Sequence, residues 1–340
     1  MAESKKKVRM KDIAEKLSIS INAVSLALNN KSGVSDETRQ RVLKAAKELE
    51  YNEGYQFFIK SNQFDNICIM TEEINFRDVK FYSDVILGIE NEAKKNKYDL
   101  IINFIDRNNY IVPPSIEQRK VSGIIIVGYV SDDYLNKVLS YDIPVILVDH
   151  ASMLINTDAV LTQNVQGSFM ETKYLIDKGH RDIGFFGDIE SSLSFNERWI
   201  GYNSAMKKYN IPVKSEFCFT EFIEQYAVKN DYKGVREMLD KREKFPTAWV
   251  CANDSAAVTL VNALELIGIK VPDDISVIGF DDIELCKIIT PNLSTIHVNK
   301  DLMGAAAVKN LIKRIHDKNM PCYHTRLEVD LIERKSVKAL

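Results

Sequence analysis

Apolar residues in the first fifty positions recur at helical spacing, in three short groups separated by small polar turns. The groups are Ile13, Ala14 and Leu17; Ala23, Val24, Ala27 and Leu28; and Val42, Leu43, Ala46 and Leu49. This spacing gives each helix one apolar face to bury. Ser20 and Ser35 stand where a side-chain oxygen caps the second and third helices. The pattern predicts a compact three-helix headpiece.

Three short helices in this arrangement are typical of a helix-turn-helix DNA reader, in which the second helix enters the major groove. Here the second helix would lead with Ser20, Ile21, Asn22 and Ser25. A small helical protein-interaction module is the alternative for this segment.

From Asn66 onward, short β-branched runs alternate with helical stretches. The expected strands include 67–70, 100–105, 123–127, 145–148, 182–186, 248–252 and 275–280, and the expected helices include 81–95, 165–177, 198–209 and 256–267. This alternation predicts an α/β body with parallel sheets covered on both faces. In such sheets, ligands bind beyond the carboxyl ends of the strands.

Polar side chains follow several of these expected strands. They are Asp149, Asp188, Asn253 and Asp281. Arg198 adds a planar fork of hydrogen-bond donors, and Phe81 and Tyr82 supply an aromatic wall. Compact planar hydrogen-bonding groups suit a polyhydroxylated ligand, because each hydroxyl both donates and accepts. Nucleobases and sugar phosphates also fit such a set. The alternative is structural: Asp254 and Asp282 cap helices, and the aromatic side chains belong to the core.

The charge distribution separates the two ends of the chain. The net charge is −3, but residues 1–60 hold twelve lysines and arginines against eight acidic residues, which leaves the remainder acidic. A basic head on an acidic body is typical of a protein that contacts DNA at one end. No apolar run approaches the roughly 20 residues needed to cross a bilayer, and no apolar segment follows Lys5–Lys7, so we expect a cytoplasmic protein.

Candidate chemistry for an enzyme is missing from the sequence. The five cysteines and five histidines show no metal-ligand spacing, and we find no Gly-x-Ser-x-Gly, Walker or Gly-x-Gly-x-x-Gly motif. We therefore expect no metal, no cofactor and no enzymatic activity.

The motifs of the headpiece resemble those of the lactose and galactose repressor family. They are Lys11-Asp12-Ile13-Ala14, Ala23-Val24-Ser25-Leu26-Ala27-Leu28-Asn29, and Gly33-Val34-Ser35 followed by Thr38-Arg39. The body continues the resemblance through Gly179-His180-Arg181-Asp182-Ile183, Asn253-Asp254 and Val271-Pro272-Asp273-Asp274-Ile275. The resemblance adds Leu26, Asn29 and Ser35 to the expected DNA contacts. It also places effector contacts at Phe81, Asp149, Arg198, Asn253 and Asp281.

The same resemblance implies the organisation of the chain. A helix-turn-helix domain takes residues 1–51, a hinge linker 52–65, and an effector-binding and dimerisation domain 66–340, whose fold is like that of periplasmic binding proteins. The N-lobe would hold about 66–161 and 291–322, and the C-lobe about 162–290 and 323–340. Both lobes would be doubly wound parallel sheets.

The linker departs from the family pattern. In the family, a leucine of the hinge helix wedges into the minor groove, but Lys60 stands at that position here. A wedge needs apolar surface. We therefore expect Phe58 or Ile59 to act as the wedge, with Lys60 contacting phosphate.

Together these features predict a transcription regulator, a repressor that binds a pseudopalindromic operator as a homodimer. A small ligand between the lobes, with a sugar as the first candidate, would control its affinity for DNA. Regulation by a phosphoprotein partner is an open alternative. A solute-binding protein of the same architecture would have no use for residues 8–50. An enzyme of that architecture would need an activated group, for which the sequence shows no motif.

Overall fold

The structure is a computed structural model that describes residues 8–28, 33–49, 51, 66–73, 81–106 and 109–340. The chain forms two compact units: one takes residues 1–65 with 120–122, and the other takes 66–119 and 123–340. The predictions for Asn29, for the hinge linker 52–65, and for its residues Phe58, Ile59 and Lys60 lie outside the described residues.

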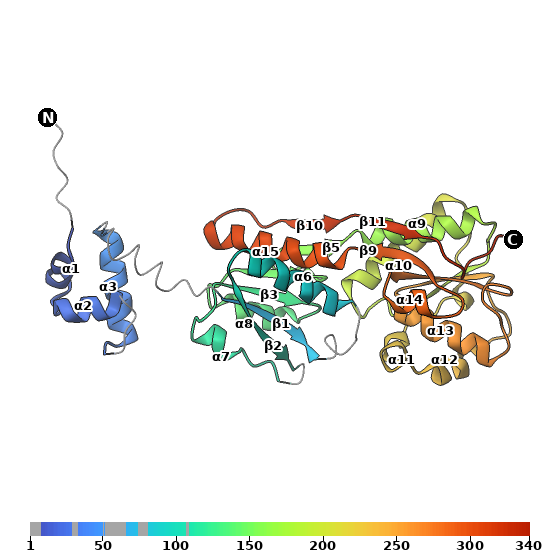
Figure 1. Cartoon of the computed structure of the whole chain (residues 1–340), viewed down its shortest axis with the longest axis horizontal. Helices are drawn as coiled ribbons and strands as arrows, with labels where there is room; N and C mark the ends of the chain where they lie inside the picture. The colour runs from blue at the N-terminus through green and yellow to red at the C-terminus, as the bar shows by residue number, and fades with distance from the viewer. Residues whose placement is uncertain (1–7, 29–32, 50, 52–65, 74–80, 107–108) are drawn as a thin grey trace, which may run out of the picture. The chain divides into compact units, whose positions relative to one another are not determined.

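The first unit contains the three predicted helices, α1 (Met10–Leu17), α2 (Ile21–Leu28) and α3 (Asp36–Glu48) (Figure 1). Their apolar faces meet in a small core that includes Ile13, Ala14, Val24, Ala27, Leu28, Val42, Ala45, Ala46 and Tyr51. Both predicted caps are present. The Ser20 hydroxyl accepts the N–H of Ala23 at 3.1 Å, and the Ser35 hydroxyl accepts that of Thr38 at 3.2 Å. The helical spacing and the capping serines thus predicted this unit correctly.

The second unit is built on two β-sheets, as the alternation of strands and helices predicted. The first sheet has the order β10-β5-β4-β3-β1-β2 and is parallel throughout. Its strands are β1 (Asn66–Glu72), β2 (Asp99–Ile105), β3 (Gly123–Val127), β4 (Val145–Val148), β5 (Asp158–Thr162) and β10 (His324–Leu327).

The second sheet has the order β11-β9-β8-β7-β6. Its strands are β6 (Ile183–Phe186), β7 (Ala248–Cys251), β8 (Ser276–Asp281), β9 (Ser294–Val298) and β11 (Val329–Ile332). The edge strand β11 runs antiparallel to β9, whereas the other pairs are parallel. We call the half of the body around the first sheet the first lobe and the half around the second sheet the second lobe.

Helices cover both sheets (Figure 1). Those of the first lobe are α6 (Tyr82–Lys95), α7 (Pro114–Glu117), α8 (Asp132–Leu139) and α15 (Lys300–His316). Those of the second lobe are α9 (Asn164–Asp177), α10 (Leu193–Lys208), the short 3-10 helix η1 (Ser215–Phe217), α11 (Ile223–Lys229), α12 (Tyr232–Leu239), α13 (Asp254–Leu266) and α14 (Leu285–Ile288).

The chain passes between the lobes three times, but two of the expected crossing points are wrong. The family resemblance implies changes of lobe at about 290/291 and 322/323. Strand β9 instead belongs to the second sheet, and β10 belongs to the first. The crossings therefore lie between β5 and α9, between β9 and α15, and between β10 and β11. Strand order depends on hydrogen bonds between segments distant in the chain, so hydrophobic patterning could not locate these points.

Two glycines allow α6 and α15, two of the helices that cover the first sheet, to pack closely against each other. A Cβ at Gly304 would overlap the carbonyl oxygen of Val85, and a Cβ at Gly88 would overlap the carbonyl oxygen of Asp301. Only glycine allows this close backbone contact. The contact fixes the start of α6, where Phe81 and Tyr82 lie, against the start of α15.

Within the described part of the chain, no helix combines the length and the apolar character that a membrane span requires.

Candidate functional site

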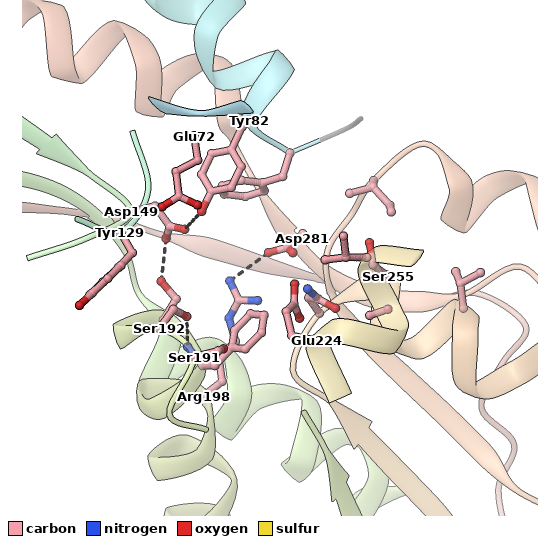
Figure 2. Close-up of a pocket in the computed structure, with 18 of the residues that line it drawn as sticks. Glu72, Tyr82, Tyr129, Asp149, Ser191, Ser192, Arg198, Glu224, Ser255 and Asp281 are labelled. Carbon is pink, nitrogen blue, oxygen red and sulfur yellow. Dashed lines mark hydrogen bonds and ion pairs between the residues drawn. The ribbon is translucent and has the colours of Figure 1, made fainter. Parts of the chain in front are cut away.

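A cavity of about 670 Å³ lies between the two lobes, and side chains from both lobes line it (Figure 2). All six residues that the sequence predicts as effector contacts are among the lining: Phe81, Tyr82, Asp149, Arg198, Asn253 and Asp281. They come from five separate segments of the chain, since Phe81 and Tyr82 are neighbours. The structure therefore brings the whole predicted set together at one cleft.

Arg198, on α10, is the most constrained of these residues. Its side chain is 3% exposed, and its three guanidinium nitrogens each donate a hydrogen bond. Nε donates to Asn164 Oδ1 at 3.0 Å, Nη1 to the Ala252 carbonyl at 2.6 Å, and Nη2 to Asp281 Oδ1 at 2.9 Å. The guanidinium also stacks on the ring of Phe280, 3.7 Å from the centroid. A planar fork held at three points presents its remaining N–H groups in a fixed direction.

Asp281 is held in an unusual backbone conformation at the end of β8. It has a φ of 112°, and the following Asp282 has a φ of 52°. Residues other than glycine seldom adopt positive φ values. Lys300, buried at the start of α15, donates to the carbonyl oxygens of Asp281 at 2.6 Å, Asp282 at 3.2 Å and Val298 at 3.3 Å. The lysine thus supports the turn that directs Asp281 toward Arg198.

Asp149, directly after β4, accepts hydrogen bonds from both lobes. Tyr82 Oη donates to its Oδ2 at 2.9 Å, and Ser194 Oγ donates to its Oδ1 at 2.7 Å. Burial raises the pKa of Asp149, while Arg198 and the two hydroxyl donors oppose that rise. Burial and the nearby carboxylate of Asp149 raise the pKa of Tyr82. Tyr82 is therefore a polar contact as well as the apolar wall that the sequence predicts.

Asn253 combines a structural and a lining position. Its side-chain oxygen accepts the N–H of Ala256 at 2.8 Å and so caps α13. Asp254 does not cap that helix, contrary to the structural alternative drawn from the sequence. It points into the second lobe, where it accepts bonds from the Ile283 N–H at 3.0 Å and the Thr295 hydroxyl at 2.6 Å. Burial, and then the charge of Asp281, raise the pKa of Asp254.

Asp188 is the one strand-end residue of the sequence analysis that does not line the cavity. Its carboxylate accepts the N–H of Phe222 at 2.9 Å and that of Glu224 at 3.3 Å. These bonds fix the start of α11, which carries Glu224 to the cavity wall. Asp188 therefore acts on the cavity indirectly, through the position of α11.

Several lining residues were not predicted from the sequence. They include Glu72, Tyr129, His150, Ser192, Ser194, Phe195 and Glu224. Glu72 ends β1, so the rule that found Asp149 and Asp281 could also have found it. That rule could not have found Ser194, because Ser194 does not follow a strand and reaches the cleft from the first turn of α10 in the second lobe.

In the headpiece, the structure places the predicted DNA contacts around the first turn of α2. Ser20, Ile21 and Asn22 are exposed there, while Ser25 and Leu26 are half-buried. Ser35 is exposed at the start of α3, and its hydroxyl is bonded within its own cap. An exposed helix start flanked by a capped turn is the geometry that a recognition helix needs.

Comparisons with known proteins agree with this geometry. Residues 9–53 match the family described as bacterial regulatory proteins, lacI family, and residues 172–337 match a periplasmic binding protein-like domain. The chain is 31% identical to the HTH-type transcriptional repressor PurR of Vibrio parahaemolyticus, over 97% of this chain and 99% of that protein.

Solved structures show the same architecture. A LacI family transcriptional regulator from Enterococcus faecium with bound ribose has a TM-score of 0.69 and 26% identity, over 81% of this chain and 99% of that one. The lac repressor dimer bound to operator and an anti-inducer has a TM-score of 0.67 and 24% identity, over 98% and 100%. The chain therefore belongs to the lacI family of bacterial regulatory proteins and is a DNA-binding transcription regulator with a ligand-binding body.

Proposed function

We propose that the chain is a repressor whose affinity for operator DNA is set by a small polyhydroxylated ligand, a sugar, bound in the cleft between the two lobes. The observation that carries this proposal is the convergence of Asp149, Arg198, Asn253 and Asp281 on one cavity. Each of these groups is planar and is held by the protein before any ligand arrives. Such preorganised donors and acceptors match sugar hydroxyls, which need both.

The position of the cavity supports a role in control. A ligand there would contact Asp149 of the first lobe and Arg198 of the second, so its binding depends on the angle between the lobes. A ligand that binds one lobe arrangement better than another shifts the population toward it. The regulator from Enterococcus faecium with bound ribose supports a sugar as the ligand class.

The proposed repressor acts as a homodimer on a pseudopalindromic operator in the bacterial cytoplasm. A single recognition helix covers few base pairs, and two heads related by two-fold symmetry multiply affinity and specificity. The lac repressor dimer bound to its operator supports this assembly. Within the proposal, Ser20, Ile21, Asn22, Ser25, Leu26 and Ser35 contact DNA.

The test has two steps. Operator sites are first selected from random duplex DNA with the full chain, and the selected sequences are expected to be pseudopalindromic. Thermal shift and calorimetric titration with ribose, other monosaccharides, cellobiose and their phosphates then identify the ligand. A full chain that selects an operator but gives no heat or thermal shift with any sugar would contradict the sugar proposal. That result would favour control by a phosphoprotein partner.

A further inference from the structure

A chain of four polar side chains, of which the last is half-buried and the others are buried, runs from the cavity to the segments that connect the lobes. Its first link is Arg198, which donates to Asn164 at the start of α9, directly after the first crossing between the lobes. Asn164 Nδ2 in turn donates to Glu197 Oε2 at 3.0 Å. Asn164 and Arg198 are 1% and 2% exposed, so water does not compete for these bonds.

The last link is an ion pair between the lobes. Arg326, on β10 of the first sheet, donates from Nη2 to Glu197 Oε1 at 2.6 Å and from Nη1 to Glu197 Oε2 at 3.0 Å. Nη1 also donates to the carbonyl oxygen of Thr162, the last residue of β5, at 3.3 Å. The hydrogen bond and charge of Glu197 raise the pKa of Arg326. Arg326 therefore connects β5 and β10, the two first-lobe strands that lead into crossings, to α10 of the second lobe.

The geometry of this pair restricts the angle between the lobes. A two-pronged arginine–carboxylate pair keeps both side chains nearly coplanar, unlike a single contact. Glu197 precedes Arg198 on the same helix, so a rotation of the second lobe that broke the ion pair would also move the guanidinium in the cavity. Arg326 is followed by Leu327, the last residue of β10, and then by the crossing to β11.

We propose that Glu197 and Arg326 are positioning residues that hold the angle between the two lobes, and that Asn164 links this ion pair to Arg198 at the ligand site. A ligand that pulls on Arg198 then acts on the lobe angle through three side chains. The link to DNA binding rests on the proposed function, whereas the restriction of the lobe angle by Glu197 and Arg326 is independent of it.

The direct test measures the distance between the lobes with no ligand present. Spin labels are attached to cysteines introduced at the exposed Glu117 of α7 and the exposed Glu265 of α13, after Cys218 and Cys322 are replaced by serine. Pulsed electron resonance then gives the distance distribution. Labelled protein is mixed with an excess of unlabelled protein, so that distances within one protomer dominate.

The variants separate the ion pair from general stability. Arg326→Gln removes the fork, and Glu197→Gln/Arg326→Gln removes both charges, so that no buried carboxylate is left alone if the single variant fails to fold. Arg326→Lys keeps the charge but not the two-pronged contact. Arg236→Gln is the matched control, because Arg236 pairs only with the exposed Asp240 on its own helix among the contacts of the described chain.

Wild type and Arg236→Gln are expected to give one narrow distance. Both glutamine variants are expected to lose it, with a broader or second distance, and Arg326→Lys is expected to fall between. A distribution in the double variant that matches wild type would overturn the proposal, even if its melting temperature fell. The same proteins are then titrated with the selected operator, where coupling energies of common size predict a change of about 5- to 150-fold. A changed distance with unchanged operator affinity would uphold the ion-pair inference and contradict the coupling in the proposed function.

Discussion

The Ser194 hydroxyl donates a 2.7 Å hydrogen bond to Asp149 Oδ1, and this bond joins the two lobes across the cleft. Asp149 follows a strand of the first sheet, whereas Ser194 lies in the first turn of α10 in the second lobe. Tyr82 occupies the other carboxylate oxygen. A ligand that enters here meets a carboxylate that is already oriented from both sides.

Loss of this bond should weaken the folded body. Ser194→Ala is expected to lower the free energy of unfolding by about 1.5 to 3 kcal/mol, because the acceptor is a carboxylate and bonds to charged groups are the stronger ones. Urea denaturation measures the loss. Ser204→Ala on the same helix is the control, since that exposed hydroxyl bonds only to the Ile200 carbonyl among the contacts of the described residues. Equal effects of the two substitutions would show that the bond across the cleft contributes nothing particular.

Replacement of Lys300 should lower the stability of the folded body. Lys300→Met keeps most of the side-chain volume but leaves three carbonyl oxygens without their donor, including those of the left-handed Asp281 and Asp282. Unfolding free energy is expected to fall by at least about 2 kcal/mol. Lys309→Met, an exposed position on the same helix, should stay within about 0.5 kcal/mol. A tolerated Lys300→Met would mean that the turn needs no support from α15.

The stability of the body should decline as pH rises from about 4 to about 7. Burial raises the pKa of both Asp254 and Asp281 above the ordinary 3.8. In this interval the folded state therefore binds more protons than the unfolded state, so the free energy of unfolding falls as pH increases. Asp281→Asn removes one of these groups and should make the decline shallower in urea denaturation at several pH values. The exposed Asp99→Asn should leave it as in wild type. A decline of equal slope in wild type and Asp281→Asn would contradict the assignment.

Asn22 should set sequence preference and not overall affinity for DNA. It is exposed on the first turn of α2, where base edges are read, and it carries no charge. Asn22→Ala is expected to reduce discrimination at one or two base pairs of the selected operator, at about 1 to 3 kcal/mol. The slope of log K against log salt should stay unchanged, because that slope counts neutralised phosphates. Competition binding with single-base operator variants at several salt concentrations measures both quantities. A changed slope with the same base preference would assign Asn22 to the backbone.

Much of the fold and of the candidate site could be predicted from local patterns. The spacing of Ile13, Val24 and Val42 predicted the headpiece because each helix must bury one face. Asp149 and Asp281 were found because parallel strands bring their carboxyl ends to one edge. The contact of Asp149 with Ser194 was not predicted, because it depends on how two lobes close. The sheets to which β9 and β10 belong were not predicted for a similar reason, because each is fixed by hydrogen bonds to strands elsewhere in the chain: β9 pairs with β8 and β11, and β10 pairs with β5.

The central claim is that a ligand in the cleft controls DNA binding, and the most direct test is the dissociation constant for the selected operator as each sugar of the panel is added. For wild type, one sugar should change this constant by about 5- to 150-fold. Asp281→Asn removes the carboxylate that pairs with Arg198 and lines the cleft. For this variant, the dissociation constant without sugar should match wild type, and the sugar should no longer change it. If no sugar changes the wild-type constant, or if the same sugar acts equally on Asp281→Asn, the cleft does not control DNA binding in the way proposed.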